Sequence, residues 1–418
     1  MGTWFNISIA LVVFMGIASG GMFSLVLMSN RKQQLPFTIA LALVLLTAVL
    51  GAIGSVSILN DIAGGLANSI VLLILSITLG YALTTISVLS DTRRKPGNPP
   101  GTAALLIDPA ERIDVVLLAP GEPPEYNTRH AARRLELADD AVDVPPLLLR
   151  PFYMRDIKSK YQAIGPSPYR DSHIELARKV QSRIGNAHKV TLAFYSDEPE
   201  LAVKLNALIK EGARRIVLSH VRITDPPDAV ASGELYDGVN VEMYGVRVRQ
   251  TQPMWDSQLL PQIYVRRMIE ALPHAGPDLT EVGLLLVGRG HIQSGKSAAE
   301  RSAEEANYLR RVRDAIVRLG FDESKSAIGW LRHSPTVAES LRELVAAGCK
   351  TVYSIPASFT ADGLNTLFDI PEQVDPIVRA SSIKLISLGG WNADDLAAEE
   401  IAAYVRAASP LLAESRRS

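Results

Sequence analysis

Three residues in the second half of the chain could take up protons or hold a divalent metal ion. His291 lies two positions beyond Arg289 in a loop after a predicted strand, and Asp369 and Glu372 lie about one helical turn beyond Asn365. A neutral imidazole and a carboxylate each bind a proton near neutral pH, and each can ligate a divalent ion. His291 and Asp369 are therefore the candidate catalytic residues, with an ordinary loop histidine as the alternative for His291.

Other charged and polar residues have two interpretations each. Arg289 stays protonated and has no lone pair for a metal or a proton. Its fork of donors could hold a carboxylate of a ligand, or it could pair with Asp362 or Asp369 and join two loops. His220 and His333 lie at the ends of predicted strands, where we interpret them as polar strand-end residues, with metal ligation as the alternative.

The segment from Gly290 to Ser297 fits the GxxxxGKS pattern of a phosphate-binding loop. It follows a predicted strand and precedes a predicted helix, so a nucleotide site is one alternative for this loop. No acidic residue at the end of a second predicted strand is a clear magnesium ligand, which favours a function other than nucleotide binding.

The elements that must position these residues alternate between short β-branched runs and helical patterns. This alternation predicts an α/β fold with a parallel sheet covered by helices. Strands are predicted at 115–119, 190–194, 215–219, 283–287, 327–330 and 351–355. Helices are predicted at 172–183, 200–211, 299–319 and 336–347.

The elements also repeat. Residues 189–222 align with residues 325–358 at a constant offset of 136, which matches Pro199 with Pro335 and Gly212 with Gly348. Two similar halves, at about 112–255 and 278–418, predict a cleft between them. Because ligands of open parallel sheets bind beyond the carboxyl ends of the strands, the loops at 120–124 and 288–294 should face that cleft.

The first ninety residues are apolar. Charge-free runs at 4–28, 37–59 and 62–89 each exceed the roughly 20 residues that cross a hydrocarbon core. Basic residues lie at 31–32 and 93–95, while Asp61 is the charge between the second and third runs. The positive-inside rule then predicts a multi-pass protein of the cell membrane, with its N-terminus outside and everything after residue 90 in the cytoplasm.

We expect a three-helix transmembrane region at 1–90, a Pro/Gly-rich linker at 91–111 and an α/β domain at 112–418. Gly16 and Gly20 form a small-residue face, which predicts packing within the chain, with a homodimer contact as the alternative. The 43 basic and 44 acidic residues are nearly balanced, so no nucleic-acid partner is expected. The single cysteine, Cys349, excludes an intramolecular disulfide and a Cys-rich zinc site.

Several motifs occur in a characteristic order: VVLLAPGEP at 115–123, a Tyr-x-x-Ile-Gly-x-Ser-Pro pattern within 146–169, LLLVGRGH at 284–291 and the segment 328–370. In this order and spacing they resemble the ferrochelatases and the wider class II chelatases. The resemblance covers the chain from residue 114 to about 408. It implies a fold of two similar Rossmann-like halves, preceded here by three transmembrane helices.

The resemblance also implies an activity, the insertion of a divalent metal, usually ferrous iron, into a porphyrin to form haem. It places family-site positions at Pro120, Arg289, Gly363 and Asn365. The family carries a histidine at the position of Arg289 and a His-x-Glu pair at the positions of Gly363 and Asn365. Glycine has no side chain, and an amide is neither a base nor a strong ligand. Ordinary metal insertion therefore conflicts with these positions.

The same resemblance assigns substrate contacts to Arg289, Tyr153, Trp330 and Phe359, and it leaves the metal ligands unassigned. Two functions of different class follow. The first is a membrane-anchored enzyme of tetrapyrrole metabolism with a rearranged site, taking porphyrin and divalent iron as substrates. The second is a catalytically silent relative that binds porphyrin, haem or a protein partner at the membrane.

Overall fold

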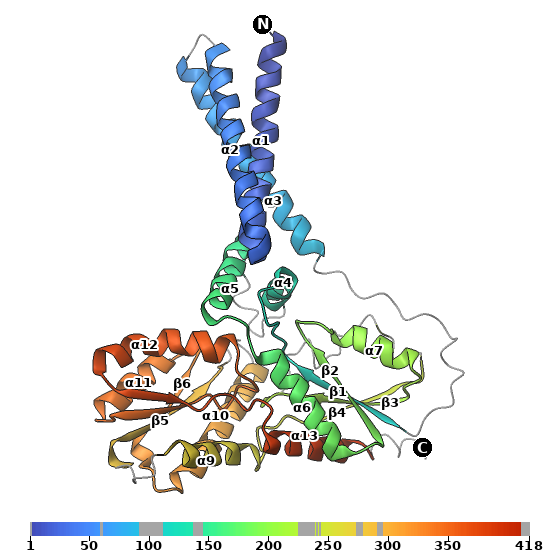
Figure 1. The fold of residues 1–418 in the computed structure, drawn as a ribbon, viewed down its shortest axis with the longest axis vertical. Helices are drawn as coiled ribbons and strands as arrows, with labels where there is room; N and C mark the ends of the chain where they lie inside the picture. Colours follow the sequence, from blue (N-terminus) through green and yellow to red (C-terminus); the bar gives the residue numbers. More distant parts are fainter. Residues whose placement is uncertain are drawn as a thin grey trace. The chain divides into compact units, whose positions relative to one another are not determined.

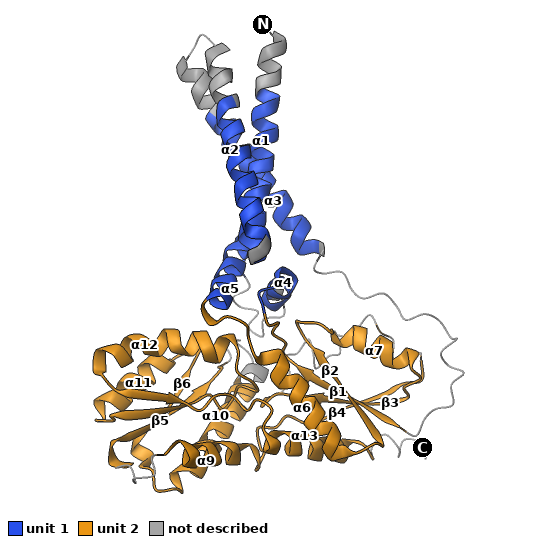
Figure 2. Cartoon of the chain, viewed as in Figure 1, with its two compact units in different colours: residues 1–94, 125–138, 143–162 blue, residues 95–124, 139–142, 163–418 orange. Residues whose placement is uncertain are grey.

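A computed structural model describes residues 2–58, 62–91, 112–136, 145–224, 239, 241, 244–272, 279–290 and 296–410. The chain forms two compact units, which Figure 2 shows in different colours. Unit 1 comprises residues 1–94, 125–138 and 143–162, and unit 2 comprises residues 95–124, 139–142 and 163–418.

Unit 1 is helical. Its long helices are α1 (Gly2–Met28), α2 (Arg31–Ile58) and α3 (Ile62–Asp91), and its shorter ones are α4 (Thr128–Glu136) and most of α5 (Arg150–Ile164). Three windows, Ile9–Met28, Gln33–Leu50 and Ile70–Ser90, are long and apolar enough to cross a membrane. The three apolar helices predicted from the sequence are thus confirmed.

Small residues let α1 and α3 approach closely. A Cβ atom added to Gly20 would overlap the carbonyl of Ile77, and one added to Gly80 would overlap the carbonyl of Ile17. A Cβ on Gly16 would lie 2.6 Å from the Cβ of Ser76. The predicted packing of the small-residue face within the chain is therefore confirmed.

Unit 2 contains two parallel four-stranded sheets, visible on the two sides of Figure 1. The first has the order β2-β1-β3-β4 and the second the order β6-β5-β7-β8. The strands are β1 (Ile113–Ala119), β2 (His188–Phe194), β3 (Arg215–His220), β4 (Arg247–Gln250), β5 (Val282–Gly288), β6 (Ser326–Trp330), β7 (Thr351–Ile355) and β8 (Lys384–Ser387). All six predicted strands are present. The additional strands β4 and β8 have only four residues each, too short for a clear periodic signal.

The helices of unit 2 are α6 (Tyr169–Ile184), α7 (Leu201–Lys210), α9 (Leu260–Ala271), α10 (Lys296–Val317), α11 (Val337–Ala346), α12 (Ile370–Ser381) and α13 (Asp395–Ala408). A five-residue π-helix, Asn365–Asp369, precedes α12. Because α13 follows the last strand of the second half and packs against α6 of the first, the end of the chain joins the two halves (Figure 1). One hydrophobic cluster accordingly contains Val115 and Leu117 from β1, Leu284 from β5 and Ile401 from α13.

The internal repeat holds at the level of the backbone. In the first half the N–H of Phe194 donates to the carbonyl of Pro199 at 2.9 Å, and in the second the N–H of Trp330 donates to that of Pro335 at 2.9 Å. Both prolines follow a cis peptide bond. The fold is therefore the predicted α/β fold with two similar halves.

Candidate functional site

The carboxyl ends of the two central strands carry the residues that the sequence placed at the site. Pro120, Gly121 and Glu122 follow β1, and Arg289 follows β5. The loop after β7 carries Gly363. Ligands of open parallel sheets bind at such strand ends.

Glu122 is a buried carboxylate at the end of β1. Its Oε1 accepts hydrogen bonds from the hydroxyl of Ser167 at 2.5 Å and from the N–H of Leu364 at 2.9 Å. A Cβ atom added to Gly363 would lie 2.6 Å from the same oxygen. The carboxylate of Glu122 therefore fills the volume that any side chain at position 363 would need.

A second polar contact joins the two halves beside it. Thr360 Oγ1 lies 3.3 Å from Tyr169 Oη and 3.2 Å from His173 Nε2, and His173 Nδ1 lies 2.9 Å from the carbonyl of Tyr169. A carbonyl accepts only, so Nδ1 carries the proton and Nε2 accepts from Thr360. Burial lowers the pKa of His173 to about 4 and raises the pKa of Tyr169 to about 12, so both are neutral at pH 7.

At the end of β3, His220 uses both of its ring nitrogens. Its Nδ1 lies 2.5 Å from Tyr195 Oη, and its Nε2 lies 2.9 Å from Gln250 Oε1. Burial, with a smaller contribution from the charge of Arg222, lowers the pKa of His220 to about 4. The guanidinium of Arg222 lies 5.8 Å from the centre of the Tyr195 ring. His220 is therefore a neutral strand-end residue without a free lone pair.

The loop after β5 is held by a carboxylate from α10. The N–H groups of Arg289 and Gly290 donate to the two oxygens of buried Glu305 at 2.7 and 3.2 Å. Gly290 has a φ of +77°, and a Cβ atom there would lie 2.9 Å from His333 Nε2. The ring of His333 packs on Trp330, with 4.8 Å between the centroids. The side chain of Trp330 is itself buried.

Asp362 organises the neighbouring loop between β8 and α13. Its two oxygens accept from the N–H of Gly390 at 2.9 Å and from Nδ2 of Asn392 at 2.8 Å. Asn392 Oδ1 accepts in return from the N–H of Asp362 at 2.8 Å. These bonds fix the loop against the segment that contains Gly363.

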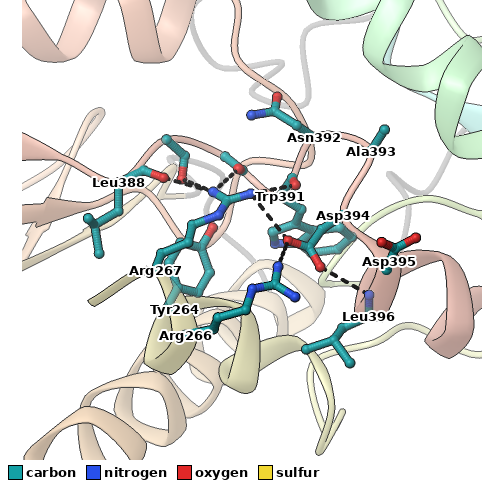
Figure 3. Close-up of polar contacts among 12 residues, drawn as sticks. Tyr264, Arg266, Arg267, Leu388, Trp391, Asn392, Ala393, Asp394, Asp395 and Leu396 are labelled. Atoms are coloured by element: carbon teal, nitrogen blue, oxygen red, sulfur yellow. Dashed lines mark hydrogen bonds and ion pairs between the residues drawn. The ribbon is translucent and has the colours of Figure 1, made fainter. Parts of the chain in front are cut away.

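Two arginines of α9 also hold this loop (Figure 3). Arg267 donates to the carbonyls of Leu388 at 2.7 Å, Gly390 at 2.5 Å and Trp391 at 2.8 Å. Arg266 and Arg267 both pair with the carboxylate of Asp394, which also accepts from the N–H of Leu396 at the start of α13. These hydrogen bonds and ion pairs therefore fix the conformation of the loop between β8 and α13.

The other predicted site residues are dispersed. Asn365 and Asp369 are half-buried at the two ends of the π-helix, and Phe359 is buried in the core of the second half. Tyr153 belongs to α5 in unit 1, whereas the other predicted contacts belong to unit 2. His291 and most of the phosphate-loop pattern lie outside the described residues.

The described residues include no group of three or more His, Cys, Asp or Glu side chains that could hold a metal ion. Glu122, Tyr169 and Thr360 were not predicted as site residues. For Glu122 a signal was available, since it is the only charged residue in the glycine-bearing loop 120–124 that was expected to face the cleft.

Comparisons with known proteins point to one family of relatives. The ferrochelatase of Geobacter sp. (strain M21) is 21% identical over 318 residues, which span 72% of this chain and 99% of the relative. The ferrochelatase of Geotalea uraniireducens (strain Rf4) is 23% identical over 282 residues, which span 63% of this chain and 87% of the relative.

Among solved structures, the sirohydrochlorin chelatase SirB from Bacillus subtilis subspecies spizizenii is 11% identical, with a TM-score of 0.45 over 72% of this chain and 96% of that chain. No protein-family model matches the chain. The sequence similarity confirms the predicted resemblance: the chain is related to the ferrochelatases.

Proposed function

We propose that the chain is a membrane-anchored chelatase that inserts a divalent metal ion, ferrous iron by analogy with its relatives, into a porphyrin at the strand ends of unit 2. The observation that carries the proposal is the carboxylate of Glu122 in the volume beside Gly363. The resemblance assigns this position to a histidine, so a proton-accepting group from the first half replaces one from the second.

Metal insertion needs acceptors for the two protons that leave the pyrrole nitrogens as the metal binds. Glu122 is the proposed acceptor of one, and His291 or Asp369 is the proposed acceptor of the other. Arg289 has a guanidinium suited to a propionate of the porphyrin. Ser167 and the N–H of Leu364 hold the carboxylate of Glu122 in one orientation, as a positioned acid–base group requires.

Binding of a tetrapyrrole without metal insertion is the second candidate function. Two observations favour it. The carboxylate of Glu122 already accepts two hydrogen bonds, and the described residues lack a three-ligand metal group. A protein of this kind would hold porphyrin or haem at the membrane, and a homodimer or another membrane protein could be its partner.

The membrane position is part of the proposal. Basic residues near the ends of α1, α2 and α3 favour an N-terminus outside the cell and unit 2 in the cytoplasm. In intact cells unit 2 should be protected from an added protease, and it should be cleaved once the cells are lysed. Cleavage of unit 2 in intact cells would contradict this orientation.

The function is tested with the detergent-solubilised full chain, protoporphyrin and either ferrous or zinc ion. Insertion is followed by the loss of porphyrin fluorescence, and binding is titrated separately without metal. Glu122→Gln keeps the shape and the acceptor oxygen but cannot take a proton. We expect turnover to fall by about 100-fold or more with porphyrin affinity unchanged, while Glu125→Gln, an exposed neighbour, keeps full turnover.

The outcomes separate the two candidates. Porphyrin binding without turnover in the unaltered chain establishes the second candidate and refutes the first. Equal turnover in Glu122→Gln and in the unaltered chain refutes the role of Glu122. Absence of both binding and turnover refutes both functions.

A further inference from the structure

Four large apolar side chains of unit 1 are exposed within six residues at the start of α5. Leu148, Leu149, Phe152 and Tyr153 have exposed fractions of 42%, 48%, 45% and 51%. Exposed apolar side chains that lie close together on a surface mark a site of interaction with a membrane, a ligand or another protein. We call residues 147–153 the apolar segment.

The apolar segment lies beside the membrane helices and not beyond their ends. Tyr81 Oη donates to the carbonyl of Leu148 at 2.6 Å. Tyr81 lies nine residues before Ser90, the end of the third apolar window, and nine helical residues span about 13 Å. The ring of Phe152 packs against those of Phe23 and Tyr81, at 6.3 Å from each, and both belong to apolar windows.

The backbone here is also suited to an apolar phase. Hydrocarbon tolerates only backbone groups that are satisfied within the protein. The carbonyl of Pro145 accepts from Arg150 Nε at 3.2 Å, that of Pro146 from the N–H of Leu149 at 2.8 Å, and that of Leu147 from the N–H of Arg150. Together with the bond to Leu148, four consecutive carbonyls are satisfied, and Pro145 and Pro146 have no N–H to satisfy.

Side chains of α5 and of the segment 126–128 contact the end of α1. Lys158 is buried and its Nζ donates to the carbonyls of Val26 at 3.0 Å and Ser29 at 3.3 Å. Desolvation lowers the pKa of Lys158, and the charge of Arg155 lowers it further. Tyr126 and Thr128 donate their hydroxyls to the carbonyl of Met28, so the last carbonyls of α1 are capped.

We infer that the apolar segment is embedded in the lipid bilayer, with acyl chains as its partner. Its four exposed side chains continue the lipid-facing surface of α1 and α3 at a level inside their apolar windows. Polar residues at 155, 156 and 159 follow on the exposed side of α5. Unit 1 then contacts the membrane through three spans and a fourth, non-spanning element. This inference rests on the proposed membrane anchoring and is independent of the proposed catalysis.

Site-directed spin labelling of the full chain in phospholipid nanodiscs tests this inference. The chain has one cysteine, which is buried, so Cys349→Ala gives a background for single labels. Labels at Phe152→Cys and Leu149→Cys are compared with Ser159→Cys, an exposed residue of the same helix, and with Leu79→Cys on the exposed side of α3. The readout is collision with oxygen, which enriches in lipid, relative to a water-soluble nickel chelate.

We expect the oxygen-to-nickel ratio at 149 and 152 to be at least about threefold higher than at 159 and close to the ratio at 79, since a lipid-facing label loses contact with water. Equal ratios at 152 and 159, with a lipid-like ratio at 79, overturn the inference alone. A water-like ratio at 79 overturns the membrane anchoring itself. Protection from both reagents at 152 shows a protein surface over the segment and also overturns the inference.

Discussion

The two halves of unit 2 share their backbone and differ at the ends of their central strands. In each sheet the second strand along the chain is the edge strand beside the first. In each half the loop after that second strand is closed by a backbone hydrogen bond to a proline carbonyl. After β1, however, the chain places the buried carboxylate of Glu122. After β5 it places the cation of Arg289, and a carboxylate from α10 holds the backbone of that loop.

The difference shows which features a duplicated fold keeps. Hydrogen bonds of the backbone depend on the path of the chain, so both halves retain them. Side chains at the strand ends depend on what lies opposite, and Glu122 and Gly363 fit one another because the glycine leaves the space that the carboxylate fills. If the resemblance is right about positions 363 and 365, one carboxylate of the first half lies where the family has side chains of the second half.

Removing the carboxylate of Asp394, which links α9 to the start of α13, should have the largest effect on stability. Asp394→Ala deletes the N-cap of α13 and leaves Arg266 and Arg267 without their shared carboxylate. We expect a loss of about 4 kcal/mol in the free energy of unfolding, from about 1 for the cap and about 3 for the partly buried ion pairs. Thermal unfolding of the full chain in detergent measures it.

The matched control is Asp395→Ala, which removes an exposed carboxylate that pairs with Lys179 and Arg183. Exposed ion pairs contribute below about 1 kcal/mol, so this variant should be nearly neutral. Equal losses in the two variants would show that the contacts of Asp394 in Figure 3 stabilise the fold no more than an exposed ion pair does.

The fit between the two halves is tested next by Gly363→Ala. The new methyl group would lie 2.6 Å from Glu122 Oε1, so we expect about 3 kcal/mol of destabilisation from overpacking. In the double variant Glu122→Ala with Gly363→Ala the clash is gone, and its loss should be smaller than the sum of the two single losses. Additive losses, measured by the same unfolding assay, would mean that the residues do not compete for one volume.

Acid sensitivity should be concentrated in the first half, where His220 is buried. Its pKa is lowered from 6.5 to about 4 in the folded state, so the unfolded chain binds a proton more readily. Stability is therefore complete above pH 6.5 and is lost as the pH falls toward 4. Between pH 7.5 and pH 5 the contribution is about 2 kcal/mol. His220→Gln should unfold with about that much less pH dependence, measured by thermal unfolding of both chains at pH 7.5 and pH 5.

The smallest effect is expected at the start of α11. Thr336 accepts from the N–H of Glu339 at 3.2 Å, and Glu339 accepts from the N–H of Thr336 at 2.6 Å, which is a capping box. Thr336→Ala should cost about 1 kcal/mol. Glu339→Gln keeps an acceptor oxygen and should cost less. The equivalent helix α7 has Glu200 as its N-cap residue, without a side-chain cap bond, so the box distinguishes the two halves.

Local patterns were sufficient for most of the fold. The three apolar helices and six of the eight strands in the two sheets follow from runs and periodicities within a few residues of one another. The repeat at offset 136 follows from comparing residues 189–222 with residues 325–358. Strands β4 and β8 were not predicted, because RVRQ and KLIS are too short to show a period. The position of α13 was also not predicted, since its sequence gives an amphipathic helix but not the helix on which it packs.

The sequence by itself determined the apolar helices and the duplicated α/β units, and it predicted that Arg289, Gly363 and Asn365 stand at the family's site positions. Only the tertiary structure decided which side chain fills the space beside Gly363. Glu122 and Leu364 are 242 positions apart, and no local period connects them. Their contact exists because the two halves dock through one shared core, which brings a loop of the first onto the backbone of the second.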